Sequence, residues 1–114
     1  MDKKIKYQNV IKNLASEVAA LMPTEENNFQ TFKIFDDESS QYLIYTSGWV
    51  DGHRDYGCFF HMHITENDKV YIEHDGTDLV LADQLVEQGV EQSDIVLAWH
   101  APDVRHFVKG FALA

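Results

Sequence analysis

A two-residue turn near the middle of the chain constrains the fold more than any other sequence feature. Asp51-Gly52 suits the hairpin turn that requires a positive φ at both central residues. Residues 41–49 before it and residues 54–66 after it are rich in the aromatic and β-branched side chains that strands favour. The sequence therefore predicts a long antiparallel hairpin in which Trp49 lies opposite Arg54.

Neighbouring segments extend this hairpin into a meander. Residues 29–35 have the composition of a strand, and the polar run 36–40 that follows them is typical of a turn. Asn67-Asp68 is a second candidate for a two-residue turn, and residues 69–74 after it form another predicted strand. The pattern predicts about four antiparallel strands in consecutive order.

The N-terminal segment has the periodicity of an amphipathic helix. Apolar side chains recur at helical spacing through residues 2–22. Asp2 is a suitable N-cap, and Pro23 is expected to stop the helix before a polar loop at residues 24–28.

The C-terminal part adds shorter elements. Residues 77–88 are expected to form a second helix, capped by Thr77 and ended by glycine. Residues 95–99 suit a short fifth strand, Pro102 begins a helical turn to Phe107, and the apolar tail 110–114 should pack against the body. The 114 residues fit one α+β domain spanning residues 1–114.

The charge of the chain restricts its partners. Nine lysines and arginines stand against nineteen acids, which gives a net charge of −10. Nucleic acids and anionic membranes bind through basic residues, so direct contact with either is not expected. One cysteine cannot form an internal disulfide, and a cytoplasmic protein without a cofactor is predicted.

Two-residue turns would divide the sheet into two faces. The first is strongly apolar, is expected to pack under the helices, and comprises Leu43, Tyr45, Cys58, Phe60, Met62, Ile64 and Tyr71. The second face mixes aromatic, imidazole and aliphatic groups, which is typical of a partner or self-association surface. Together with the hairpin end, it supplies the predicted partner-binding residues Tyr42, Ile44, Trp49, Arg54, Phe59, His61, His63 and His74.

Three of these histidines could in principle bind a metal. His61 and His63 share a strand face, and the predicted register places His74 opposite His61. Three imidazoles can hold Zn²⁺ and leave a position for water, as in a small metal-dependent enzyme. The alternative, ordinary histidines on a sheet surface, is favoured because no acids stand at a spacing suited to orienting them.

Other reactive residues have structural explanations. Asp75 and Asp78 could act as paired carboxylates, but a turn followed by a helix N-terminus accounts for both. Cys58 is expected on the apolar face of a strand, where a thiol is a packing group and not a nucleophile. No catalytic residue is predicted.

Several short motifs, taken together and in order, resemble those of the XisI family, the fdxN element excision controlling factors found mainly in cyanobacteria. They cover nearly the whole chain and comprise Gly48-Trp49, Tyr56-Gly57-Cys58, His61, Asp75-Gly76-Thr77-Asp78, Leu85-Val86-Glu87-Gln88-Gly89-Val90, Asp94-Ile95-Val96-Leu97 and Gly110-Phe111-Ala112.

This resemblance implies a role beside a site-specific recombinase. XisI-like proteins act with a nuclease-related companion, XisH, in the developmentally timed excision of a DNA element. The resemblance implies no catalytic residues, and His63 and His74 depart from the usual pattern of the family. A non-enzymatic accessory factor is therefore expected, with an antitoxin-like inhibitor of the companion as the alternative and a homo-oligomer as a further expectation.

Overall fold

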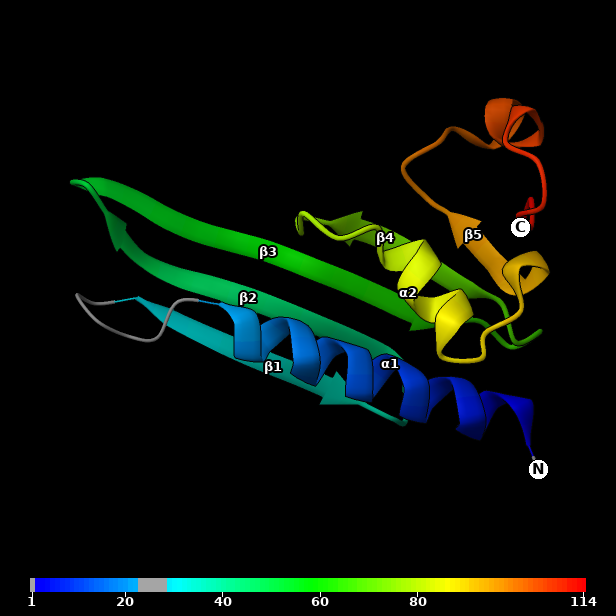
Figure 1. The fold of residues 1–114 in the computed structure, drawn as a ribbon, viewed down its shortest axis with the longest axis horizontal. Coiled ribbons are helices and arrows are strands. Elements are labelled where there is room, and N and C mark those ends of the chain that lie inside the picture. Colours follow the sequence, from blue (N-terminus) through cyan, green and yellow to red (C-terminus); the bar gives the residue numbers. More distant parts are fainter. Residues whose placement is uncertain (1, 23–28) are drawn as a thin grey trace.

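A computed structural model describes residues 2–22 and 29–114, and its elements form a helical layer on a sheet (Figure 1). The helical elements are α1 (Lys3–Leu21), α2 (Leu81–Glu87) and the 3₁₀ turns η1 (Gln92–Asp94) and η2 (Pro102–Phe107). The strands are β1 (Gln30–Asp36), β2 (Gln41–Val50), β3 (His53–Ile64), β4 (Val70–Asp75) and β5 (Ile95–Leu97).

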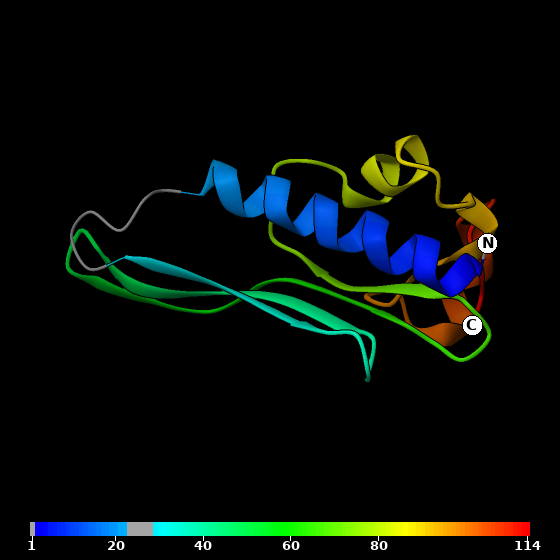
Figure 2. The same ribbon diagram turned by 90° about the horizontal axis from the view of Figure 1, so that it is seen from below.

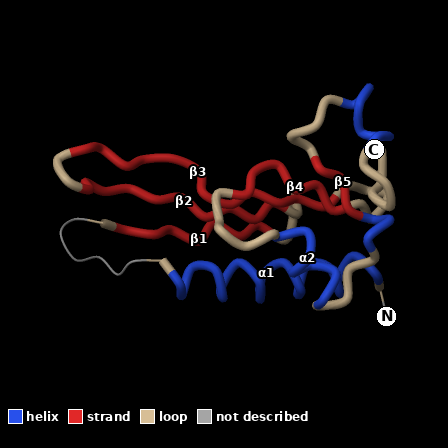
Figure 3. Tube along the Cα trace, turned by 45° about the horizontal axis from the view of Figure 1, so that its top comes forward, coloured by secondary structure: helices blue, strands red, loops and turns tan. Residues whose placement is uncertain are grey.

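The strands form one sheet in the order β1-β2-β3-β4-β5 (Figure 3). The first four are antiparallel neighbours, which confirms the predicted meander and the α+β class. β5 pairs with β4 in parallel, because α2 carries the chain back across the sheet before β5 begins.

α1 forms as its periodicity predicts. The Asp2 carboxylate accepts a hydrogen bond of 2.9 Å from the backbone N–H of Lys4, which confirms the N-cap. The buried stripe follows the helical period and consists of Tyr7, Ile11, Leu14, Ala15 and Val18. The expected stop at Pro23 and loop 24–28 lie outside the described residues.

α2 is shorter than predicted, because Thr77 does not cap it. The chain from Thr77 to Val80 forms a turn instead, in which the Asp75 carboxylate accepts from the backbone N–H groups of Thr77 and Leu81 at 2.9 and 3.1 Å. The expected end of the helix is confirmed, since Gly89 follows it with φ of 108°.

The central hairpin turn is confirmed. Asp51 and Gly52 have φ of 50° and 79°, and Trp49 pairs with Arg54 as predicted. Farther from the turn, Tyr45 pairs with Cys58, again in the expected register.

A β-bulge beyond that pair makes part of the face prediction wrong: Phe60, Met62 and Ile64 are buried as predicted, but Leu43, Tyr45 and Cys58 do not share their face. Ile44 pairs with Phe60, so Phe59 is an extra residue on β3 that has no partner on β2. Because side chains alternate along a strand, one extra residue on β3 reverses which β2 side chains share a face with the β3 side chains beyond it. Tyr42 and Ile44, expected on the exposed face, are fully buried in the core.

A second bulge restores one expected pairing. The turn between β3 and β4 spans three residues, since Thr65 N–H bonds to Lys69 O at 2.9 Å, and not two as predicted. Glu73 is then an extra residue on β4, so His61 still pairs with His74.

α1 and α2 cover one face of the sheet (Figure 2). The strand residues buried against them include Tyr42, Ile44, Phe60, Met62 and Ile72. We call this side the inner face and the opposite side the outer face. No helix in residues 2–22 and 29–114 is long and apolar enough to cross a membrane.

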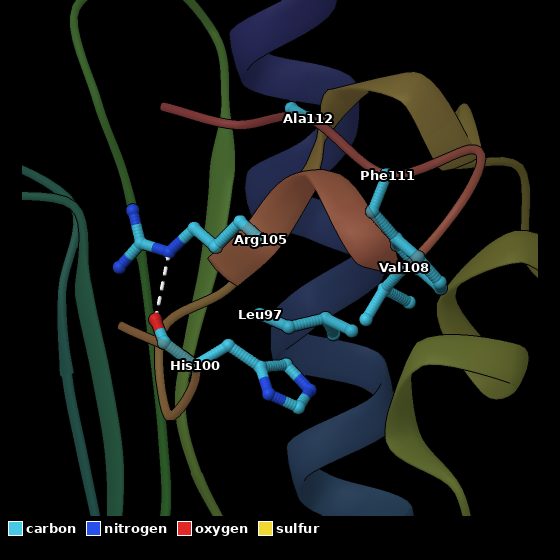
Figure 4. Close-up of a pocket in the computed structure, with 6 residues that line it drawn as sticks. All are labelled: Leu97, His100, Arg105, Val108, Phe111 and Ala112. Carbon is cyan, nitrogen blue, oxygen red and sulfur yellow. Dashed lines mark hydrogen bonds between the residues drawn. The ribbon is translucent and has the colours of Figure 1, made fainter. Parts of the chain in front are cut away.

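The C-terminal segment closes the β5 end of the molecule, as predicted for the tail. The Ala112 N–H donates to Ile95 O at 2.8 Å, so the tail pairs with the strand edge. Arg105 Nε donates to His100 O at 2.9 Å, and Val108 and Phe111 pack beside Leu97 (Figure 4). This packing holds the last residues against the sheet.

Gly76 provides a test of the first bulge. A Cβ at Gly76 would lie 2.8 Å from Phe59 O and 3.0 Å from its ring, so Gly76→Ala should destabilise the fold by about 1–3 kcal/mol. Gly57→Ala is the matched control, because its Cβ would have no atom within 4 Å. Urea unfolding measures both; equal stability of the two variants would contradict the close approach.

Candidate protein-interaction surface

The outer face of β1, β2 and β3 is a continuous, mainly apolar surface. The register places aligned side chains on it in rows that cross the three strands. From the hairpin turn towards the body the aromatic, aliphatic, thiol, imidazole and guanidinium members are Trp49, Arg54, Tyr56, Tyr45, Cys58, Phe32, Leu43, His61, Ile34 and His63. The polar residues Gln30, Ser47 and Gln41 and the acidic Asp36 complete the rows.

Several of these side chains are strongly exposed. The exposed fraction is 44% for Phe32, 49% for Ile34, 54% for Trp49 and 67% for Tyr56. In the described residues, no helix packs on this part of the sheet (Figure 2). Contiguous apolar surface of this kind is typical of protein–protein contact sites.

An arginine between two aromatic rings marks the hairpin end of the outer face. The Arg54 guanidinium lies 5.7 Å from the Trp49 ring and 5.2 Å from the Tyr56 ring. It also donates to Gly48 O at 3.2 Å. Tryptophan, tyrosine and arginine are the residues most enriched in binding hot spots, and here they are held in a fixed arrangement.

The histidines at the other end of the face are joined to neighbours. His61 Nε2 lies 2.8 Å from Gln41 Oε1, and His63 Nε2 lies 2.8 Å from Glu73 Oε2. The His63 ring stacks on Tyr71 with centroids 5.0 Å apart. Burial, followed by the nearby His63, lowers the pKa of His61, so its imidazole is neutral at pH 7.

The described part of the chain contains no group of three or more His, Cys, Asp or Glu residues that could hold a metal. His74 instead lines an open cleft of about 290 Å³ together with Glu73, Asp75 and the exposed Trp99. These residues give the outer face a polar rim.

Comparisons with known proteins agree with this fold. The model of the XisI protein family matches residues 1–113. The chain belongs to the XisI family. A search of curated proteins finds no match.

Two solved structures of XisI proteins are similar over almost their full length. A XisI-like protein from Anabaena variabilis has a TM-score of 0.87 and 30% identity, over 97% of this chain and 99% of that one. The fdxN element excision controlling factor XisI from the same organism has a TM-score of 0.84 and 28% identity, over 99% and 100%.

In this XisI-family chain the structure brings together five of the eight predicted partner-binding residues. Trp49, Arg54, His61, His63 and His74 lie on the outer face or at its rim. The other three, Tyr42, Ile44 and Phe59, lie elsewhere because of the first bulge.

The prediction that Tyr42 and Ile44 lie on an exposed face is wrong, because both lie in the core and are 0% exposed. Phe59, the bulged residue, is half-buried on the helical side next to Val18 and Leu79. None of these three is available to a partner on the outer face.

Sequence reasoning missed that Phe32, Ile34, Leu43, Tyr45 and Tyr56 lie on the outer face. It also placed Cys58 under the helices, whereas the thiol is half-buried on the outer face. Burial raises the pKa of the Cys58 thiol, which keeps it protonated and unreactive at pH 7. Alternation in β1 could have shown that Phe32 and Ile34 share a face, but not which face the helices cover.

A second surface of this XisI-family chain is acidic. Asp83 and Glu87 are one helical turn apart on the exposed side of α2, and Asp78 and Glu91 flank the helix. Among the residues that the structure describes, none of these four is in an ion pair. We call these four residues the acidic side.

Proposed function

We propose that this chain is a non-enzymatic accessory factor in the excision of a DNA element by a site-specific recombinase. It acts by binding a XisH-like, nuclease-related companion. Membership of the XisI family and similarity to a protein described as an excision controlling factor support this role.

The acidic side is the observation that carries the proposal. Its carboxylates are exposed, and they are four of the nineteen acids of a chain with a net charge of −10. A companion that handles DNA needs a basic surface, because DNA affinity comes largely from lysines and arginines. An acidic surface attracts such a protein and accelerates its association.

The acidic side also defines what the complex would do. Carboxylates that occupy a DNA-binding surface compete with phosphates for the same cations. The companion bound to this chain is therefore held away from DNA until the complex dissociates. An antitoxin-like inhibitor would act through the same contact, so both roles share one physical mechanism.

Charge reversal on the acidic side tests the proposal. The double variant Asp83→Lys/Glu87→Lys is expected to bind the companion at least about tenfold more weakly, because two attractive contacts become repulsive. Isothermal titration calorimetry at low and moderate salt measures the affinity. Wild-type affinity should itself fall as salt rises.

Asp103→Lys is the control, since Asp103 is an exposed acid on η2, away from α2. The control should bind like the wild type apart from a small effect of net charge. Unchanged binding of the double variant, or no complex with wild-type protein at any salt concentration, would overturn the proposal.

A further inference from the structure

The outer face differs from the rest of the molecule in charge. The chain has nineteen acids, yet of the fourteen side chains that the register places on the outer face of β1, β2 and β3 only one, Asp36 at the end of β1, is a carboxylate. The only other permanent charge among them is that of Arg54, at the opposite end of the face. A strongly basic protein has little electrostatic reason to bind there, whereas two antiparallel copies of this chain can meet on it with the acidic end of each face over the Arg54 end of the other.

The extent of the outer face suits a small protein–protein interface. Five rows of side chains on three strands give a projected area of about 480 Å². Protruding side chains make the accessible area larger than the projection, so it approaches the roughly 600 Å² per partner of the smaller specific interfaces.

The two ends of the face are complementary in charge. Arg54 lies at the hairpin end of β3, and Glu73 lies beside His63 at the other end of the same strand. Rotation about a twofold axis across the middle of the strands superposes each end on the opposite end of the other copy. Arg54 of one copy then faces Glu73 of the other, and Phe32 and Tyr45 lie near the axis.

We propose that a second copy of this chain covers the outer face, with its strands antiparallel to those of the first. Two sheets packed face to face in this way bury the apolar rows of both copies. The proposal rests on the proposed function in one respect, namely that this protein acts through protein contacts. It assigns the outer face to the second copy and leaves the acidic side of each copy to the companion.

Light scattering after gel filtration tests the assembly. The wild type is expected at twice the 13.1 kDa of one chain, across roughly 10 µM to 1 mM, where complexes of micromolar Kd are populated. Phe32→Glu places two carboxylates at the axis and should give the mass of one chain. Val80→Glu on the helical side, where Val80 is 59% exposed, should remain a dimer.

Circular dichroism should show that Phe32→Glu remains folded, because Phe32 is exposed and lies outside the core. If that variant unfolds, Ile34→Lys, exposed on the same strand, takes its place. A wild-type protein of one-chain mass throughout the range, or dimers in both Phe32→Glu and Ile34→Lys, would overturn the proposal.

A charge exchange tests the antiparallel arrangement. Arg54→Glu should weaken dimerisation by at least about tenfold, and Arg54→Glu/Glu73→Arg should restore it. No recovery in the double variant would reject this arrangement. Companion binding measured on Phe32→Glu separates the two proposals. If this variant binds the companion, the acidic side is supported as the binding surface even when no dimer forms. If the wild type dimerises but never binds the companion, the proposed function is rejected and the dimer proposal stands.

Discussion

Replacing Tyr42 by alanine is expected to lower the free energy of unfolding by about 3–5 kcal/mol, because a large buried side chain leaves a cavity in the core. Tyr42 is 0% exposed and lies edge-on to Phe35 with ring centroids 5.9 Å apart. Its hydroxyl donates to the Asp37 carboxylate at 2.7 Å, a hydrogen bond that the variant also loses.

Tyr56→Ala is the matched control, since it removes the same side chain from the exposed outer face. Tyr56 is 67% exposed, so the cost should stay below about 1 kcal/mol. Urea denaturation followed by circular dichroism measures both variants. If Tyr42→Ala were as stable as Tyr56→Ala, Tyr42 would lie on the surface and the first bulge would be misplaced.

Asp94 is expected to stabilise the fold above pH 4 and to lose this effect in acid. Its buried carboxylate accepts from the Tyr7 hydroxyl at 2.6 Å and from the Lys3 and Lys69 ammonium groups at 3.0 Å each. Asp94 thereby joins the start of α1, the start of β4 and η1. Asp94→Ala should therefore destabilise the protein by about 2–4 kcal/mol, because buried Tyr7 loses its acceptor.

The pH dependence follows from the pKa of Asp94. Burial alone would raise this pKa, but the hydrogen bonds from Tyr7, Lys3 and Lys69 outweigh burial and lower it from 3.8 to about 2. A carboxyl whose pKa is lower in the folded state stabilises the fold above pH 3.8 and loses that stabilisation as the pH falls through about 2. The contribution is about 2 kcal/mol.

Stability curves of wild type and Asp94→Asn between pH 7 and pH 2 measure this contribution. The difference between the two should be largest near neutral pH and shrink in acid. Asp103→Asn, a change at an exposed carboxylate, should follow the wild type. A constant difference at every pH would show that the ionised Asp94 does not stabilise the fold.

Local sequence patterns were enough to predict most of the elements and the central register. Asp51-Gly52 required one type of turn, which fixed the pairs Trp49–Arg54 and Tyr45–Cys58. The helical period of residues 2–22 and the capping Asp2 specified α1. These features are local, so a few neighbouring residues define them. The resemblance to the XisI family also rests on short motifs in a fixed order, and the match to the family model confirms it.

Which side chains of the sheet are buried could not be predicted from the sequence alone. The run Cys58-Phe59-Phe60 is apolar throughout, so alternation does not reveal that Phe59 is bulged. The bulge lets Tyr42, Ile44 and Phe60 lie on the same face, where they are buried in the core with α1. This burial depends on contacts between residues far apart in the chain, and it leaves Phe32, Ile34 and Tyr56 exposed on the opposite face.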